Sequence, residues 1–303
     1  MDGTPFHPGE LEAQALAGAG SRGAGIRDLM PEQHRIFFGQ LPLLFAALGD
    51  ETGHPIATVL SGEPGFIRSP APTTLSIRAL PALDDPAALH LKPGQPIGLL
   101  GLEFPTRRRN RANGLITARD PGGFSVAVRQ SFGNCAKYIQ ARTPQAVEHA
   151  AGGSTEIISQ LDDAARALIR RSDTFFVAST SEVRKLGGLD ISHRGGRPGF
   201  VGIDGEVLSV PDFAGNNYFN TLGNLLRDPR ASLLFIDFEN GAMLQLQGRV
   251  EIVWSGLEVT RLTGAERIWR LHVTSGWRRH AALPLHWSPP EPAATTLGTG
   301  IWA

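Results

Sequence analysis

The sequence lacks the residues and segments that several protein classes require. Cys135 is the only cysteine, which excludes an intramolecular disulfide and any zinc or iron–sulfur site built from this chain's thiolates alone. The 29 basic residues are balanced by 29 acidic ones, and zero net charge argues against a nucleic-acid clamp or a polybasic membrane binder. The longest apolar stretches, such as residues 41–48, are far shorter than the roughly 20 residues of a membrane span, and no signal segment opens the chain. We therefore expect a cytoplasmic protein with no nucleic-acid and no membrane partner.

The composition predicts a folded, loop-rich protein. Apolar residues make up 41% of the chain and charged residues 19%, which is typical of globular domains with a hydrophobic core. The 36 glycines and 22 prolines indicate many turns and argue against a helical bundle, so short strands joined by loops fit better. A length of 303 residues favours two domains of ordinary size.

An internal repeat supports that division. Sliding the sequence by 134 positions superimposes similar residues without a gap, most clearly Gly53 on Gly187, Gly62 on Gly196, residues 64–66 on 198–200 and residues 99–104 on 233–238. The ordered match indicates a tandem duplication. We place an N-terminal extension at residues 1–30, a first repeat at 31–150, and a second repeat with a C-terminal extension at 151–303. The linker is expected over 143–154.

Each repeat is predicted to begin with a helix and to continue in strands. The helices are expected at 31–40, with Pro31 in the first helical position, and at 155–171, where one apolar stripe contains Ile158, Leu161, Ala165 and Leu168. In the second repeat, β-branched or aromatic runs bounded by turn residues predict strands at 175–178, 200–203, 231–238 and 243–254. The fold class is therefore mainly β with flanking helices.

Three segments of the second repeat carry a family likeness. His193–Phe200, Asp228–Phe235 and Gln245–Val250 resemble the pyridoxamine 5′-phosphate oxidase-like family of FMN-binding split barrels, over residues 172–254 and, in a more diverged form, over 41–142. Gly133–Ile139 is also similar to the Gly-Asn-Cys-Pro-x-Tyr-Ile segment of tandem members, with Ala136 in place of proline. The resemblance implies two tandem split β-barrels that form an internal pseudo-dimer, with FMN as the cofactor at their interface.

The resemblance also implies a flavin site with most of its residues in the second repeat. Loop 214–221 leads into a helix start at 222–226, where free backbone N–H groups suit a phosphate, whereas the matching loop 80–87 has two acids and two prolines. Residues 190–194 align with the family strand that runs along the flavin ring. Asn220 and Thr221 stand where the oxidases have an Arg-Lys pair on the phosphate, so this chain lacks those two cations. The cofactor-binding residues implied here are Asp190, Ile191, Ser192, Arg194, Asn216, Asn217, Asn220 and Thr221.

The first repeat is expected to complete this site with arginines. Arg109 and Arg111 fall at the Gln and Arg positions of the family strand that reaches the partner barrel's flavin. Strand alternation places Arg107, Arg109 and Arg111 on one face and Arg108 on the other. Such a guanidinium cluster needs an anion, although a solvated charged hairpin is the alternative. Because the second repeat keeps the phosphate-binding loop and the first repeat keeps the arginines, we infer one composite flavin site per chain.

Other candidate residues are given structural roles. We expect His193 to be exposed or structurally bonded rather than catalytic, Cys135 to be a small buried group, and Trp269, Trp277 and Trp287 to cover barrel surface. The helix expected at residues 6–14 packs on the barrels without chemistry of its own. The nine histidines show no metal-ligand spacing, and no catalytic residue is assigned.

The resemblance implies an FMN-binding oxidoreductase that transfers hydride or electrons through the flavin. Its small-molecule substrate is unidentified, and its electron donor would be a separate molecule such as NAD(P)H or a reductase. Two alternatives remain: a non-catalytic flavin- or haem-binding carrier or sensor, and a barrel pair without a ligand. The sequence leaves open whether one chain acts alone or as a homodimer.

Overall fold

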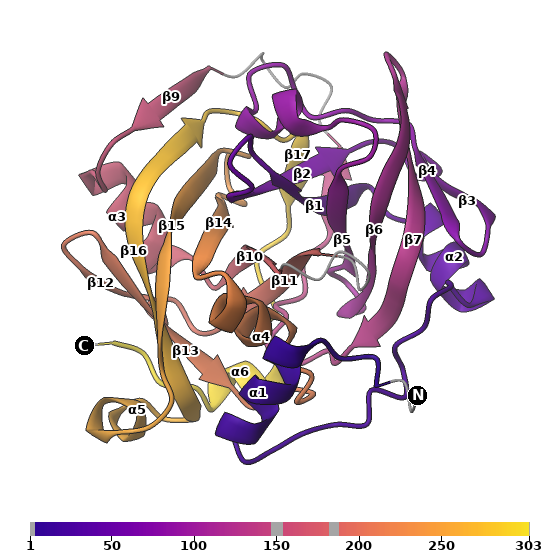
Figure 1. The fold of residues 1–303 in the computed structure, drawn as a ribbon. Coiled ribbons are helices and arrows are strands. Elements are labelled where there is room, and N and C mark those ends of the chain that lie inside the picture. The colour runs from indigo at the N-terminus through magenta and orange to yellow at the C-terminus, as the bar shows by residue number, and fades with distance from the viewer. Residues whose placement is uncertain (1–3, 147–153, 182–187, 303) are drawn as a thin grey trace.

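Two β-sheets lie side by side and meet across an extended interface (Figure 1). The computed structural model describes residues 4–146, 154–181 and 188–302. The first sheet is seven-stranded and contains β1 (Leu43–Gly49), β2 (Pro55–Ser61), β3 (Ile67–Ala71), β4 (Thr74–Ile77), β5 (Pro96–Glu103), β6 (Arg108–Asp120) and β7 (Gly123–Asn134). The second is eight-stranded and contains β9 (Thr155–Ile158), β10 (Thr174–Thr180), β11 (Leu189–Gly195), β12 (Gly202–Asp204), β13 (Val207–Phe213), β14 (Arg230–Ile236), β15 (Met243–Val253) and β16 (Ala265–Arg279).

The strand order is the same in both sheets. It runs β2-β1-β5-β6-β7-β4-β3 in the first and β11-β10-β14-β15-β16-β13-β12 in the second, with β9 added beside β16. The pairing register also repeats: Leu100 lies opposite Arg111, and Leu234 lies opposite Gln245, both pairs being 134 positions apart. The sheets are thus two copies of one split barrel in tandem, which confirms the predicted fold class.

The repeat offset changes in the last long strand of each barrel. Phe132 of β7 lies opposite Arg111, whereas Trp277 of β16 lies opposite Gln245, so the offset there is 145. The cause is the connection between β15 and β16, which contains helix α5 (Leu257–Arg261), whereas the equivalent strands β6 and β7 are joined by a short turn. A gapless alignment therefore could not match these strands.

Strands β1 and β10 are buried on both faces because each contributes to two cores. Leu44, Ala46 and Leu48 point into the core of the first barrel, while Leu43, Phe45 and Ala47 point into a cluster between the barrels. β10 divides its side chains in the same way. The sequences of β1 and β10 are therefore almost continuously apolar and do not alternate between apolar and polar residues. The interface between the barrels is a hydrophobic core in its own right.

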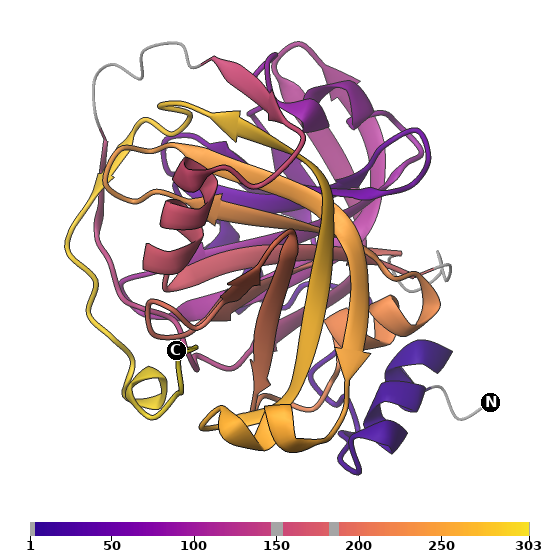
Figure 2. The ribbon, with the colours of Figure 1, turned by 90° about the vertical axis from the view of Figure 1, so that its left-hand side faces the viewer.

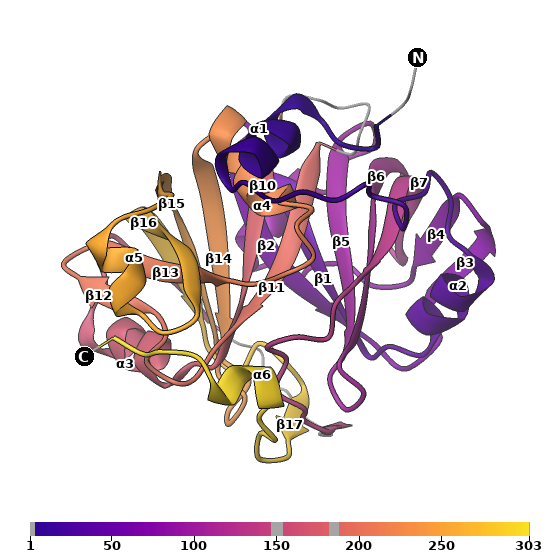
Figure 3. The same ribbon diagram turned by 90° about the horizontal axis from the view of Figure 1, so that it is seen from below.

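Helices cover the ends and outer surfaces of the barrels (Figures 2 and 3). The N-terminal α1 (Pro8–Leu16) lies directly against α4 (Asn220–Arg227) of the second barrel in all three views. The remaining helices are α2 (Glu32–Gly39), the 3-10 helix η1 (Pro86–His90), α3 (Asp163–Arg171) and α6 (Ala294–Leu297). Strands β8 (Pro144–Ala146) and β17 (Leu285–Trp287) form a separate two-stranded sheet. No helix in the described ranges is both long and apolar enough to cross a membrane.

Several predicted elements were wrong in detail. Residues 155–158 form strand β9 rather than helix, because Ile157 and Ile158 pair with β16, and the helix begins only at Asp163 behind the capping Asp162. Pro31 precedes α2 rather than occupying its first turn. The strand predicted at 200–203 is confined to Gly202–Asp204. Trp269 does not cover the surface but is fully buried in the second barrel. The predicted boundary near residue 150 lies outside the described residues.

Candidate functional site

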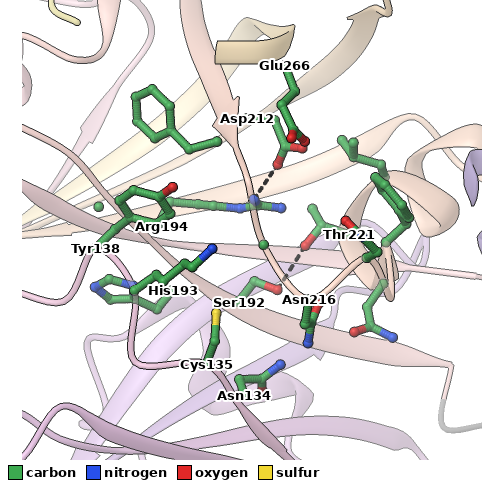
Figure 4. Close-up of a pocket in the computed structure, with 18 of the residues that line it drawn as sticks. Asn134, Cys135, Tyr138, Ser192, His193, Arg194, Asp212, Asn216, Thr221 and Glu266 are labelled. Atoms are coloured by element: carbon green, nitrogen blue, oxygen red, sulfur yellow. Dashed lines mark hydrogen bonds and ion pairs between the residues drawn. The ribbon is translucent and has the colours of Figure 1, made fainter. Parts of the chain in front are cut away.

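A solvent-open pocket of about 820 Å³, mouth included, lies where the two barrels meet (Figure 4). The first barrel contributes β6 and the segment 134–138, and the second contributes β11 and the segment from Pro211 to Leu222. Eight of the ten predicted cofactor residues line it: Arg109, Arg111, Ser192, Arg194, Asn216, Asn217, Asn220 and Thr221. The structure therefore gathers residues from both repeats at one pocket.

The other two predicted residues lie behind the pocket wall. Ile191 is fully buried in the cluster between the barrels, since it points to the opposite face of β11 from Ser192. Asp190 is also buried, and its carboxylate contacts Arg111 Nη1 at 3.0 Å and accepts a hydrogen bond from Asn113 Nδ2 at 3.1 Å. Asp190 thus supports the pocket through Arg111.

Arg111 joins the two barrels at the base of the pocket. From β6 it donates to Asn220 Oδ1 of the second barrel at 2.9 Å and also to Ser192 Oγ. Burial lowers the pKa of Arg111, and the Asp190 carboxylate acts in the opposite direction. Since its charge is shared with a carboxylate and two neutral acceptors, Arg111 is held in one position by the second barrel.

Arg109 has no carboxylate partner within the described residues. Its Nε donates to the Cys135 carbonyl at 2.8 Å, and its Nη1 contacts His193 Nδ1 at 3.2 Å. Burial lowers the pKa of Arg109 to about 10, with Arg111 and Arg194 adding to the effect, so it remains charged at neutral pH. A largely desolvated guanidinium without a counter-ion is a site for an anion.

His193 is neutral at this position, which agrees with its predicted structural role. Arg109 can only donate, so His193 Nδ1 must accept and the ring proton lies on Nε2. Burial lowers the pKa of His193 well below its usual value, and Arg109 and Arg194 lower it further. His193 is therefore a fixed partner of Arg109 rather than a proton donor that titrates near neutral pH.

Two further cations at the pocket already have carboxylate partners. Arg194 Nη1 lies 2.5 Å from Asp212 Oδ1, and Arg267 contacts Asp212 at 3.2 Å and Glu266 at 2.5 Å. Figure 4 shows Asp212 and Glu266 on the wall opposite Cys135. The paired groups make this wall nearly neutral, so the positive charge of the pocket comes chiefly from Arg109 and Lys137, neither of which pairs with a carboxylate in the described residues.

The N-terminus of α4 opens onto the same pocket. Phe219 precedes the helix in the left-handed conformation, with φ of 60°, and provides no side-chain cap. Asn220 and Thr221 form the first turn, and the Thr221 hydroxyl donates to Ser192 Oγ at 2.8 Å. An uncapped helix start presents free N–H groups and the positive end of the helix dipole, which favour an anion.

The segment after β7 supplies pocket residues that sequence reasoning did not assign. Asn134, Cys135, Lys137 and Tyr138 all line the pocket. Cys135 is only half-buried, and its Sγ lies 3.6 Å from Arg109 Nη2, so the expectation of a small buried group was wrong. The signal that could have found these residues was the Gly133–Ile139 segment itself, which carried the family resemblance.

Arg107 does not join the arginine face predicted for it. It lies in the turn before β6 with φ of 58°, so strand alternation does not apply. Its guanidinium donates to the Ile139 carbonyl at 3.1 Å and pairs with Glu291 at 3.1 Å. Arg108 is exposed and does not line the pocket. Only Arg109 and Arg111 of this run reach the pocket.

The equivalent position on the other side of the pseudo-dimer is filled by protein side chains. Asp85, which is 134 positions before Phe219, lies fully buried at the N-terminus of η1. Arg279 is paired with β15 in the same way as Asn134 is paired with β6, so the two residues are equivalent in the two barrels. The Arg279 guanidinium contacts Asp85 at 2.9 Å and Asp84 at 2.9 Å. Thr58 Oγ1 and Gln245 Nε2 also donate to Asp85, at 2.6 and 3.3 Å. An internal carboxylate and guanidinium thus close the twin site.

Residues 161–281 match the family model described as pyridoxamine 5′-phosphate oxidase, a range that includes all three segments of the second repeat that carried the resemblance. The chain has the pyridoxamine 5′-phosphate oxidase-like fold. The pocket therefore lies between two split barrels of this type, with α4 and β11 from the matched half.

Three similar solved structures each align with less than half of this chain. A haem storage protein of Vibrio cholerae, HutZ, is 13% identical with a TM-score of 0.28 and covers 39% of this chain and 93% of its own. A FAD-binding protein of Mesorhizobium loti is 12% identical, with a TM-score of 0.30 and coverage of 41% and 97%. A pyridoxamine 5′-phosphate oxidase homologue from Lactobacillus delbrueckii is 19% identical, with a TM-score of 0.26 and coverage of 35% and 95%. No curated protein matches the sequence.

Proposed function

We propose that this chain binds one FMN in the pocket between its barrels and acts as an oxidoreductase on an unidentified small molecule. The observation that carries the proposal is Arg109, a charged and largely desolvated guanidinium without a carboxylate partner in the described chain. It lies on the same pocket as the uncapped start of α4. Both features call for an anion, and FMN carries a phosphate.

The residues present fit FMN although the family's phosphate-binding Arg-Lys pair is replaced. The first turn of α4 supplies backbone N–H groups, and beside it Arg111 donates to the Asn220 side-chain oxygen at 2.9 Å. Arg109, Arg111 and Lys137 would hold the anionic parts of the ligand, while Tyr138 and Phe213 provide aromatic surface. When bound, FMN would supply the hydride- and electron-accepting ring.

The protein's own contribution would be orientation and charge. Arg111 is fixed from three sides by Asp190, Ser192 and Asn220, so its donors are already ordered before a ligand arrives. His193 orients Arg109 without changing charge near neutral pH.

A non-catalytic flavin carrier or sensor is the second candidate. One observation favours it: the histidine of this pocket is neutral, buried and bonded to Arg109, and so is not available for proton transfer. A haem carrier is a weaker candidate, because the ring of His193 is buried and its Nδ1 accepts from Arg109, which leaves the proton on Nε2, the other nitrogen that could bind iron.

Spectroscopic titration of the purified protein with FMN tests the proposal. We expect quenching of flavin fluorescence that saturates at one FMN per chain, and reduction of the bound flavin by NADPH, NADH or dithionite followed by reoxidation by oxygen or a dye. Turnover with a nicotinamide donor would support the oxidoreductase. Binding and dithionite reduction without turnover would support the carrier or sensor, and absence of FMN uptake at any concentration would reject both.

A further inference from the structure

The N-terminal helix places a buried carboxylate directly behind the pocket. Glu10 on α1 is 3% exposed. Helices α1 and α4 approach so closely that a Cβ atom added to Gly223 would lie 2.6 Å from the Glu10 backbone. A Cβ atom added to Gly9 would lie only 2.2 Å from the Gly223 carbonyl oxygen. Only glycine at these two positions permits such a close approach, so the two glycines fix how α1 packs on α4.

Glu10 fixes the orientation of Asn220. Its Oε1 accepts a hydrogen bond from Asn220 Nδ2, and its Oε2 accepts one from the His7 backbone N–H at 2.9 Å. Since the amide nitrogen of Asn220 faces Glu10, its oxygen faces Arg111 Nη1 at 2.9 Å. A continuous chain of hydrogen bonds therefore links Glu10 to the pocket arginine.

The surroundings of Glu10 contain one cation shared by two carboxylates. Asp190 on β11 contacts Arg111 at 3.0 Å, and both groups act electrostatically on Glu10. His7, the N-cap residue of α1, has its Nε2 atom 3.7 Å from Glu10 Oε2. Its Nδ1 accepts from the Gly9 N–H, its Nε2 also contacts Asn224 of α4, and burial lowers its pKa, so it is neutral. Arg227 of α4 is paired with exposed Glu12. Burial raises the pKa of Glu10 to about 7.

We propose that Glu10 is a positioning residue that takes up one proton from solvent when an anion enters the pocket. An anion at Arg111 and the start of α4 adds a third negative group to a region that holds Glu10, Asp190 and one shared guanidinium. Protonation of the Glu10 carboxylate relieves this repulsion, and no other bond forms or breaks. The inference rests on the proposed function only in taking the ligand of this pocket to be anionic.

Sulfate is a suitable probe because it does not titrate between pH 6 and pH 8. We expect the wild-type chain to bind sulfate up to about tenfold more tightly at pH 6 than at pH 8, the limit for one coupled proton with a pKa near 7. Glu10→Gln should reduce this ratio to less than about twofold. Glu12→Gln, on the exposed face of the same helix, should keep the wild-type ratio. Affinity is read from the sulfate dependence of the melting temperature.

A second measurement needs no variant. Adding sulfate to the wild-type chain in weakly buffered solution at pH 7 should take up a substantial fraction of one proton per chain. A wild-type affinity that does not change with pH, an unchanged ratio in folded Glu10→Gln, no proton uptake, or no sulfate binding at all would each overturn the inference.

Parallel titrations with FMN separate the two proposals. Sulfate binding coupled to Glu10 in a protein that never takes up FMN would uphold the inference and reject the flavin function. FMN binding with the same pH dependence in wild type and Glu10→Gln would uphold the flavin function and reject the inference.

Discussion

Phe45 and Phe176 occupy equivalent positions in the two barrels and stack on each other, with ring centroids 3.6 Å apart and an interplanar angle of 16°. Each lies on the face of its strand, β1 or β10, that points away from its own barrel core. The pseudo-symmetric interface is thus centred on a pair of identical residues, and the pocket with Arg109 and Arg111 lies along the same interface.

Removing either ring should destabilise both barrels together. Phe45→Ala and Phe176→Ala are each expected to lower the free energy of unfolding by about 3–5 kcal/mol, because both rings are fully buried. The double variant should cost less than the two single changes added, by about 1 kcal/mol, since each single variant already removes the stacked pair. Urea unfolding followed by tryptophan fluorescence measures this coupling. Additive costs would contradict a direct contact.

Arg109 and its neighbour Arg108 form a matched pair for testing ligand binding. Arg109→Gln should weaken FMN binding by about 1.5–3 kcal/mol, roughly ten- to a hundredfold, because a charge-assisted contact is lost. Arg108→Gln should leave affinity unchanged, since that side chain is exposed and lies over Phe37 at 5.1 Å, outside the pocket. Fluorescence titration gives both values. Equal affinities for the two variants would remove Arg109 from the site.

Removing the cation of the closed twin site should strongly reduce the stability of the protein without creating a second ligand site. Arg279→Gln leaves the Asp85 carboxylate fully buried without its cation and should cost about 3–5 kcal/mol. Arg278→Gln on the same strand removes only surface contacts to Glu156 and Asp162 and should cost less than about 1 kcal/mol. Thermal unfolding compares them. Two FMN molecules per wild-type chain would show that the twin site is open after all.

Glu10 should give the protein a characteristic pH dependence even without a ligand. Its folded-state pKa of about 7 lies above the usual 4.5, so the folded chain holds more protons between these values. The stabilisation is fully present below about pH 4.5 and is lost as the pH rises through 7, a difference of about 3 kcal/mol at most. Urea unfolding of wild type and Glu10→Gln across this range should show the slope only in wild type. Identical slopes would mean that Glu10 titrates normally.

The sequence predicted the architecture and most of the residues of the pocket from the duplication and the family resemblance together. An offset of 134 residues marked most of the matching strands, and the resemblance and the differences between the repeats pointed to Arg109 and Arg111 on one side and Asn220 and Thr221 on the other. Eight of ten assigned residues line the pocket.

The remainder depends on contacts that lie far apart in the chain. Glu10 and Asn220 are 210 positions apart, and only docking of α1 on α4 brings them together. Strand β9 looked helical because its apolar residues continue the stripe of α3, and pairing with β16 overrode that pattern. Arg107 was misplaced because a turn residue with positive φ does not follow strand alternation.

The ion pair between Asp85 and Arg279 has a consequence for how such a protein can diversify. In a symmetric homodimer every substitution is made twice, so a residue that improves one site alters its twin identically. Joining the two halves in one polypeptide removes that constraint. Here Asp85 faces Arg279, while the matching positions hold Phe219 and Asn134 beside an open pocket. The closed site now only holds the two barrels together, so residues of the open pocket can change to suit another ligand without weakening the ion pair between Asp85 and Arg279.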